Sequence, residues 1–466
     1  MTTRTFEVIN PATRTVLASV ADCGEEEARA AADAAVAAFD AWRRTTAYER
    51  STILRRWNDL ILANVDQIAR LMAQEMGKPV TESRGEVRYA AAFVEFYAEE
   101  AKRVYGATIP SQFAHKRLLV NRKPVGPAYA ITPWNFPAAM VTRKAAPALA
   151  AGCTMILKPA EQTPLTAMRL AELWTEAGGP SGTLQVITCS DPLPVSRVLI
   201  ADPRIRKLSF TGSTEVGMKL YAQAAATMKR ISLELGGHAP FIVFDDADIT
   251  GAVREVAASK FRNAGQTCVC ANRIYVHQRI AGEFVARFTN VVRALRVGDP
   301  LDEATQIGPL VDDAALAKVE AHVADALAKG ASVFTGGKRG EGTWFQPTVL
   351  TGVRDGMLVM QEETFGPVAP IIAFSDEAEA VSMANATSVG LAAYLWTSDL
   401  SRAFRVSEAL EYGIVGVNDG VPSTAQAPFG GVKNSGIGRE GGTWGIDEYL
   451  DVQYVSIALN GQPARG

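Results

Sequence analysis

The sequence predicts an α/β protein with two or three domains, of which two are built on mostly parallel, doubly wound sheets. Three observations support this class. The chain has 466 residues, too many for one ordinary hydrophobic core. Short apolar strands alternate with helical segments between Pro127 and Gly237, and the alternation restarts near Pro240. No tandem repeat or low-complexity linker interrupts the two halves.

The segment before this alternation is expected to be helical. Residues 25–43 are rich in Ala and charged at their start. Thr46-Ala-Tyr-Glu49 has the spacing of a capping box, which predicts a helix from there to Met76, ending at Gly77. Residues 81–105 predict a third helix.

Five strands are predicted next, over residues 127–132, 154–159, 183–188, 207–213 and 230–237. Ligands of such sheets bind beyond the carboxyl ends of the strands. Those ends carry a polar rim that contains glycine: Trp134-Asn135, Lys158 to Glu161, Thr211 to Ser213 and Glu234 to Gly237. This rim indicates a nucleotide site.

The second domain is predicted from strands at residues 241–244, 273–277, 367–374, 391–397 and 413–418, with helices between them. Two cysteines, Cys268 and Cys270, follow its first helix, so Cys268 is expected to face the rim of the first domain.

Composition excludes several classes of partner. The net charge of −3 leaves no broad basic surface for nucleic acid or an acidic membrane. Residues 1–20 lack the features of a signal peptide, and the apolar run 145–157 is too short to span a bilayer. Five cysteines do not suggest a disulfide framework, so a reducing, cytoplasmic compartment is expected.

Cys268 and Cys270 leave several interpretations open: a disulfide, core packing or a nucleophile. A metal site is not expected, because Cys-x-Cys without a nearby His or second pair supplies too few ligands. In extended chain their Cα atoms would lie about 6.5 Å apart, at the upper limit for a disulfide, and a bent loop would bring them closer. Gly436-Ile-Gly-Arg-Glu-Gly441 matches GxGxxG but follows no strand, so a flexible glycine turn is favoured over a phosphate loop.

Seven ordered motifs span most of the chain: PWNFP, LKPAEQTP, FTGSTEVG, LELGGHAP, GQTC, EETFGPV and PFGGVKNSGIGRE. Together they resemble the aldehyde dehydrogenase superfamily. The resemblance implies a Rossmann-type dinucleotide-binding domain, a catalytic domain and a small oligomerisation arm. The expected boundaries are 1–108 with 125–236 for the dinucleotide-binding domain, 237–438 for the catalytic domain, and 109–124 with 439–466 for the arm and C-terminal tail. Residues 117–122 and 453–459 would supply arm strands that pair across the subunits of a homodimer or homotetramer.

The resemblance also implies catalytic roles. Cys268 matches the nucleophile that attacks the aldehyde, and Glu234 matches the base that activates water to hydrolyse the thioester. Asn135 matches the side-chain donor of an oxyanion hole, paired with the backbone N–H of Cys268. The alternatives are core packing for Cys268, a salt bridge for Glu234 and a turn for Asn135. A thiol hydrolase or acyl transferase that uses Cys268 is the alternative activity.

Cofactor roles follow in the same way. Lys158 and Glu161 match residues that hold the adenine ribose, although a surface ion pair between them would explain both. Gly212 and Ser213 match a pyrophosphate contact at a helix N-terminus. The nicotinamide side is matched by Glu363 and Phe365, and Trp134 belongs to the same expected cofactor site. Glu161 would repel a 2′-phosphate, which favours NAD over NADP.

The closest resemblance is to the succinate-semialdehyde dehydrogenase branch. There a distal carboxylate is bound by two arginines and a serine, which match Arg143, Arg262 and Ser423, although a surface salt bridge is the usual role of an Arg. His238 and Pro422 to Thr424 depart from the branch, which leaves glutarate semialdehyde or another short ω-carboxylated aldehyde as the alternative substrate. Cys270 resembles the branch's second thiol, which bonds the nucleophile and switches it off.

Overall fold

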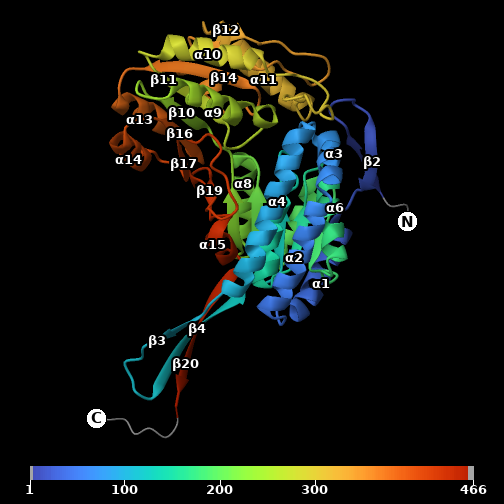
Figure 1. The fold of residues 1–466 in the computed structure, drawn as a ribbon. Helices are drawn as coiled ribbons and strands as arrows, with labels where there is room; N and C mark the ends of the chain where they lie inside the picture. The colour runs from blue at the N-terminus through green and yellow to red at the C-terminus, as the bar shows by residue number, and fades with distance from the viewer. Residues whose placement is uncertain (1–3, 460–466) are drawn as a thin grey trace.

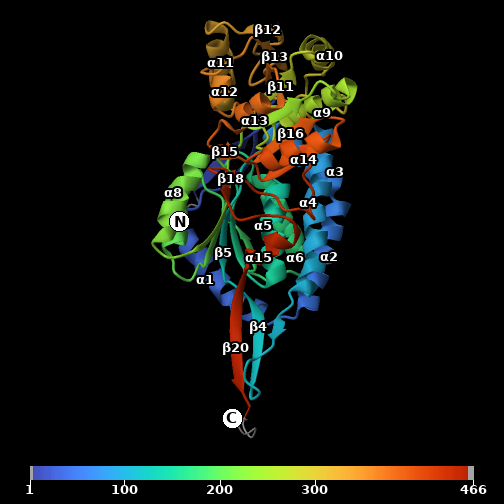
Figure 2. The same ribbon diagram turned by 90° about the vertical axis from the view of Figure 1, so that its left-hand side faces the viewer.

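A computed structural model describes residues 4–459 of the chain. Two sheets with helices around them form the body, and a narrow three-stranded sheet projects from it (Figures 1 and 2). No helix within residues 4–459 is long and apolar enough to cross a membrane.

The first sheet contains the five predicted parallel strands: β5 (Ala128–Ile131), β6 (Met155–Lys158), β7 (Leu184–Val186), β8 (Lys207–Thr211) and β9 (Arg230–Glu234). A sixth strand, β19 (Gly436–Ile437), joins antiparallel beside β9 and gives the order β19-β9-β8-β5-β6-β7. The GxGxxG match is therefore partly an edge strand. Gly436 is required there, because a Cβ atom would lie 1.9 Å from the carbonyl oxygen of Leu233.

Successive side chains of the buried strands point to opposite sides of this sheet, so both faces are apolar and must be covered. Helices cover both. Ala128 and Ala130 pack toward the N-terminal helices and α5 (Ala139–Ala151), while Tyr129 and Ile131 pack on the other face. The remaining helices of this part are α6 (Pro164–Glu176), α7 (Pro192–Ala201) and α8 (Thr214–Ala225).

The N-terminal part differs from the prediction in two places. A hairpin of β1 (Thr5–Ile9) and β2 (Val16–Ala21) precedes α1 (Glu25–Trp42). The single helix predicted up to Met76 is two helices, α2 (Ala47–Ala63) and α3 (Val65–Met76). They separate at Asn64, whose side chain donates to the carbonyl oxygen of Leu60 at 2.8 Å and so competes with the helical backbone. The third predicted helix, α4 (Val80–Glu100), ends in a short 3₁₀ turn over Ala101–Arg103.

The second sheet has seven strands in the order β12-β13-β14-β11-β10-β16-β17. All neighbours are parallel except β12 and β13. The strands are β10 (Ala239–Val243), β11 (Ala271–His277), β12 (Ser332–Thr335), β13 (Thr348–Thr351), β14 (Val368–Phe374), β16 (Ala392–Trp396) and β17 (Ile414–Val417). The helices are α9 (Ile249–Phe261), α10 (Ala281–Arg293), α11 (Asp313–Ala328), α12 (Leu358–Gln361), α13 (Glu377–Asn385) and α14 (Leu400–Ala409), with a 3₁₀ turn over Arg262–Gly265. A small bridge pairs β15 (Val389–Gly390) with β18 (Val432–Lys433).

The projecting sheet, which we call the arm, consists of β3 (Ala107–Ile109), β4 (Lys116–Pro124) and β20 (Leu450–Ala458) in the order β20-β4-β3. The two segments expected to supply arm strands pair with each other within the chain, for example Tyr454 with Val120, and their pairing across subunits stays a prediction. Helix α15 (Gly442–Asp447), from the segment expected to form the arm and C-terminal tail, has buried residues and packs against α4 and α5 in the body.

Candidate active site

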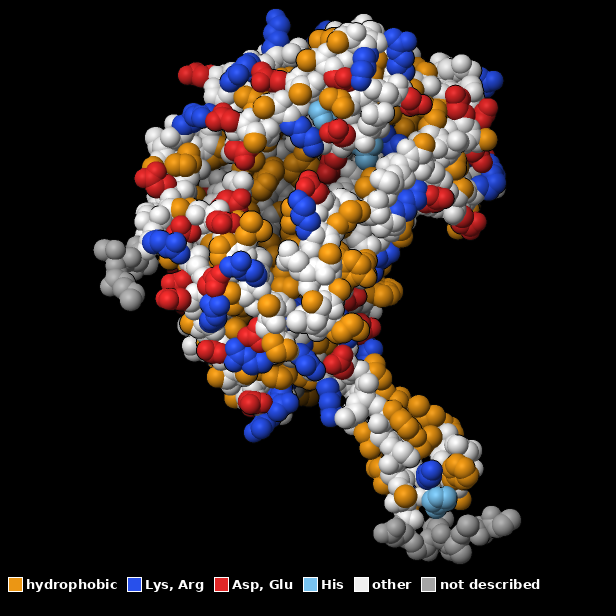
Figure 3. Space-filling view, turned by 180° about the vertical axis from the view of Figure 1, so that it is seen from behind, with side chains coloured by type: hydrophobic (Ala, Val, Ile, Leu, Met, Phe, Trp, Pro, Cys, Tyr) orange, Lys and Arg blue, Asp and Glu red, His pale blue; other side chains and the backbone are white. Residues whose placement is uncertain are grey.

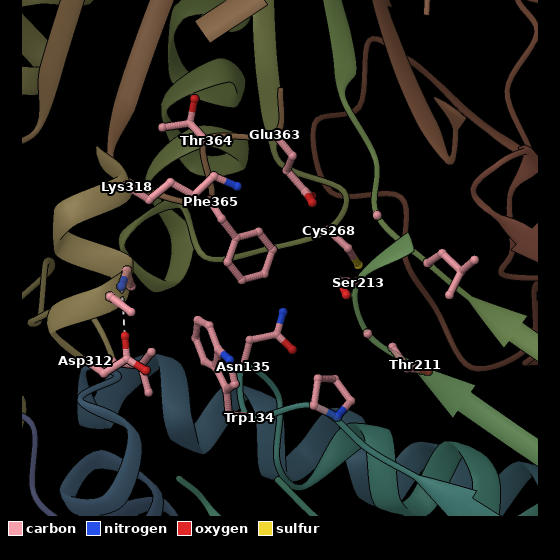
Figure 4. A pocket seen from close by; sticks show the side chains of 17 residues that line it. Trp134, Asn135, Thr211, Ser213, Cys268, Asp312, Lys318, Glu363, Thr364 and Phe365 are labelled. Carbon is pink, nitrogen blue, oxygen red and sulfur yellow. Dashed lines mark hydrogen bonds between the residues drawn. The ribbon is translucent and has the colours of Figure 1, made fainter. Parts of the chain in front are cut away.

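The predicted rim lies at the carboxyl ends of neighbouring strands. Trp134 and Asn135 follow β5, Thr211 to Ser213 close β8, and Glu234 is the last residue of β9. A cavity of about 390 Å³, the first cavity, lies between this rim and the second half of the chain. Trp134, Asn135, Cys268, Glu363 and Phe365 all line it (Figure 4).

Cys268 reaches this cavity from the connection between α9 and β11. The backbone turns sharply before it, because Asn263, Ala264 and Gly265 are all in the left-handed region, with φ of 53°, 53° and 76°. Further on, the N–H of Cys270 donates to the carbonyl oxygen of Thr267 at 3.0 Å and closes a second turn around Cys268. These two turns bring the half-buried Cys268 to the wall of the cavity.

Burial raises the pKa of the Cys268 thiol to about 12, and the nearby Glu363 and Glu234 also oppose ionisation. Arg143 and Arg262 act in the opposite direction. The raised pKa favours the thiol over the nucleophilic thiolate at neutral pH, so the predicted role of Cys268 requires that its proton be removed.

Glu234 is buried, and neither of its carboxylate oxygens has a hydrogen-bond partner among the described residues. Burial raises its pKa well above the usual range, and the charge of Glu440 raises it further. Arg143 and Lys144 partly oppose this effect. A carboxylate with a raised pKa and free oxygens has the properties of a general base for water.

Glu440 and Lys144 influence Glu234 but were not predicted as site residues. Glu440 is nevertheless the last residue of the PFGGVKNSGIGRE motif. Arg143 Nε donates to Glu440 Oε2 at 2.5 Å, and Lys144 Nζ pairs with Oε1. Burial disfavours the charge of Glu440, but these two cations outweigh it and lower its pKa. A charged Glu440 thus remains beside Glu234. Lys144 carried no sequence signal beyond its position next to Arg143.

A hydrogen bond from its own side chain fixes the position of Asn135. Its Nδ2 donates to the carbonyl oxygen of Gln266 at 3.1 Å, two residues before Cys268, and its Oδ1 is buried without a partner among the described residues. The amide and the thiol line the same cavity (Figure 4). This arrangement is compatible with the predicted oxyanion donor.

A second cavity of about 260 Å³ also reaches Cys268. Its wall includes all three residues predicted for carboxylate binding, Arg143, Arg262 and Ser423. The two guanidinium groups lie over aromatic rings: Arg143 is 4.0 Å from the centroid of Phe429, and Arg262 is 5.2 Å from that of Phe136. Arg143 Nη2 and Arg262 Nε are buried and have no partner among the described residues.

The residues predicted to bind the cofactor line the first cavity and a groove that adjoins it. A groove of about 1090 Å³ contains Lys158, Glu161 and the rim residues Trp134, Gly212 and Ser213, which also line the first cavity. Ser213 caps α8, and both Ser213 and Val216 line this space, so the N-terminus of that helix borders it. The groove and cavity together run from Glu161 to Cys268, which fits an extended dinucleotide.

Individual cofactor residues have further contacts. Lys158 Nζ and Glu161 Oε2 form an ion pair at 3.0 Å. Burial raises the pKa of Glu363 to about 7, and its Oε1 accepts the N–H of Gly237 at 3.4 Å. Phe365 has a φ of 55°, and its ring lies edge-on to Trp134 with centroids 5.4 Å apart. The start of α11, including Asp312 and Lys318, also lines the first cavity and was not predicted.

Cys270 is buried, and its Sγ donates to the carbonyl oxygen of Lys260 at 3.4 Å. All five cysteines are free thiols. The predicted redox role of Cys270 stays a prediction.

The fold and the site define one class of enzyme. The profile described as "Aldehyde dehydrogenase family" matches residues 1–455, and the chain belongs to that family.

Its relatives include succinate-semialdehyde dehydrogenase [NADP(+)] GabD of Escherichia coli, 56% identical over 97% of this chain and 94% of the relative. Glutarate-semialdehyde dehydrogenase of Pseudomonas putida is 54% identical over 98% and 95%. Among solved structures, succinate-semialdehyde dehydrogenase from Burkholderia pseudomallei has a TM-score of 0.97 and 53% identity, covering 98% of this chain and 95% of that one.

Proposed function

We propose that this aldehyde dehydrogenase oxidises succinate semialdehyde to succinate. The observation that carries this assignment is the second cavity, where two arginines with unmatched buried donors share a wall with Cys268. Unpaired buried donors are costly, and a carboxylate accepts from guanidinium in a planar, charge-assisted geometry. The names of the Escherichia coli and Burkholderia pseudomallei relatives support the same substrate.

The proposed chemistry begins when the deprotonated Cys268 adds to the aldehyde carbon and Asn135 donates to the oxygen that gains charge. NAD(P), when bound, supplies the acceptor for the hydride that leaves this adduct, so that a thioester remains on Cys268. Glu234 then takes a proton from water as the water attacks the thioester carbon. The acid leaves, and Cys268 is free for another cycle.

Glutarate semialdehyde is the second candidate, because the Pseudomonas putida relative carries that name. Its additional methylene changes the transition-state free energy by about 1–3 kcal/mol. The ratio of the two kcat/KM values therefore decides between the substrates.

We propose NAD as the preferred cofactor. Glu161 neutralises Lys158, the cation that would otherwise attract a 2′-phosphate, and its own charge repels that group. The name of the Escherichia coli relative, which includes NADP(+), points to the other cofactor. The proposal of NAD therefore rests on Glu161 alone. We also propose a reducing, cytoplasmic compartment, because the five cysteines of the sequence do not suggest a disulfide framework.

Arg262→Ala tests the substrate assignment. Because loss of one partner from a buried charge pair costs about 2–5 kcal/mol, kcat/KM for succinate semialdehyde should fall about 30- to 5,000-fold. Butyraldehyde, which has no carboxylate, should be mostly spared. Arg143→Ala is a poorer test, because Arg143 also binds Glu440 beside the proposed base.

Arg254→Ala is the matched control, since Arg254 lies on α9, the helix that ends directly before Arg262, but its side chain is 74% exposed. Equal losses with both aldehydes in Arg262→Ala would refute the carboxylate site.

A further inference from the structure

Three charged residues four positions apart lie where α3 turns into α4 and face the second cavity: Lys78, Glu82 and Glu86. Lys78 and Glu86 are 1% and 4% exposed. Burying such charges is costly unless each is paired and hydrogen-bonded. The groups that these three side chains bind therefore indicate their role.

Lys78 binds the segment that carries Asn135. Its Nζ donates to the carbonyl oxygen of Asn135 at 2.8 Å, pairs with Glu86 and lies 3.8 Å from the ring centroid of Phe136. Glu86 in turn accepts the N–H groups of Ala138 and Ala139 at 2.9 and 3.2 Å, where α5 begins. Lys78 thus has its donors occupied by protein groups.

Glu82 binds the segment that carries Cys268. Its Oε2 accepts the N–H of Asn263 at 2.7 Å. Asn263 is the first of the left-handed residues before Cys268, a conformation that costs a non-glycine residue energy and requires support.

The two segments are also joined to each other. Asn263 Nδ2 donates to the carbonyl oxygens of Asn135 and Gln266 at 3.1 and 3.2 Å. With the bond from Asn135 Nδ2 to Gln266, the contacts form a closed ring that runs through Lys78, Asn135, Asn263 and Glu82. The turn of α4 from Glu82 to Glu86 and the ion pair between Glu86 and Lys78 complete it.

We infer that Lys78 and Glu82 are positioning residues that fix the separation between the Asn135 amide and the Cys268 sulfur. Both act through backbone groups and neither has to touch the substrate. Charge-assisted bonds to α4 and to the residue just before its N-cap hold that separation while the reaction proceeds. The inference rests on the proposed roles of Asn135 and Cys268, but on no particular aldehyde.

Glu82→Ala removes the acceptor for the Asn263 N–H, whereas Glu82→Gln keeps an amide oxygen in its place. Because misplacing a transition-state contact slows the chemical step, kcat of Glu82→Ala should fall about 10- to 100-fold with both succinate semialdehyde and butyraldehyde. KM should stay within about twofold, and Glu82→Gln should recover most of the rate.

Lys78 is tested without leaving an unpaired charge by the double variant Lys78→Met/Glu86→Gln, for which the same loss of kcat is expected. Arg84→Ala is the control for damage to α4, because Arg84 binds Asp66 and Glu303 instead of the ring.

All rates are expressed per active site, titrated by the stoichiometry of Cys268 alkylation. A kcat per titrated site within twofold of wild type in Glu82→Ala would reduce the ring to a structural role and overturn the inference. A rise of KM confined to succinate semialdehyde would make these residues substrate ligands and overturn it as well. Failure of wild type to oxidise succinate semialdehyde would refute the proposed substrate instead, and the variants would then be compared with butyraldehyde alone.

Discussion

Cys268 and Glu234 share one property: burial favours the neutral form of each side chain. A protonated thiol and a protonated carboxyl are both inactive in the proposed chemistry, so each must lose its proton at a different step. The two residues are therefore distinguishable by kinetics.

Cys268→Ala should abolish NADH formation, because no adduct forms. Glu234→Gln should still form the thioester and release a burst of about one NADH per active site, followed by slow turnover. Because the pKa of Glu234 is raised, deacylation in wild type should accelerate with rising pH above the range where an ordinary carboxyl is already ionised. Stopped-flow absorbance at several pH values measures both phases, and steady turnover by Cys268→Ala would refute the nucleophile.

Glu161 gives a second prediction for a single side chain. Glu161→Ser removes the partner of Lys158 and the repulsion of a 2′-phosphate, so the ratio of kcat/KM with NADP to that with NAD should rise. Glu172→Ser on α6, whose Glu also pairs with a basic residue at the surface, is the control and should leave the ratio unchanged. A wild type that already prefers NADP would contradict this reading of Glu161.

Most elements were predictable because local patterns and tertiary structure agree. Short, wholly buried strands such as β5 and β6 read as continuous apolar runs bounded by polar ends, which is typical of a parallel sheet covered on both faces. The break at Asn64 was missed, since the apolar periodicity of α2 and α3 continues across one polar residue. Strand β19 was missed because it pairs with β9, some 200 residues earlier, and no local pattern indicates that contact.

The same division holds for the site. Cys268 and Glu234 lie in recognisable motifs, and the arginines were found through the resemblance to one branch of the family. The structure brings Cys268 to both cavities and the arginines to the second. Lys78 and Glu82 could not be singled out in this way, because their partners are backbone atoms of Asn135 and Asn263, which only the folded chain brings to them.

The corner between α3 and α4 depends on Gly77. This residue has a φ of 85°, and a Cβ atom would lie 2.7 Å from Cγ of Pro309. Gly77→Ala should therefore lower the free energy of unfolding by the cost of a left-handed residue, about 1–2 kcal/mol, plus about 1–3 kcal/mol of overpacking. Urea denaturation followed by fluorescence measures the change.

Gly356→Ala is the matched control, since Gly356 has a φ of 87° but no atom within 4 Å of the added Cβ. The free energy of unfolding of Gly356→Ala should fall only by the cost of a left-handed residue. If the two variants lost equal stability, packing at the corner would not matter.

At the scale of the molecule, the arm has an apolar face that nothing in the described chain covers. Directly opposed residues of a sheet share a face, so Val452, Tyr454, Val120, Leu118 and Ile109 lie on the same side. Tyr454 and Val452 are 59% and 68% exposed, and Figure 3 shows apolar side chains gathered along the arm. A second copy of the chain is the expected cover, as in the predicted homodimer or homotetramer.

Tyr454→Asp should weaken this association and shift the sedimentation coefficient toward that of a monomer of 49.8 kDa. Gln453→Asp introduces the same charge on the opposite face of β20 and should leave the oligomer intact. A wild type that sediments as a monomer at micromolar concentration would contradict the interface.

Because Cys268 lines both cavities, its sulfur has two approaches that different molecules can block. Nucleotide in the first cavity and dicarboxylate in the second should each protect the same thiol from an alkylating reagent, and together they should enclose it. The pattern of protection would thus report occupancy of either side without turnover. A covalent inhibitor that reacts with Cys268 could likewise extend into either cavity. A carboxylate placed in the second cavity would contact the arginines and make the inhibitor selective.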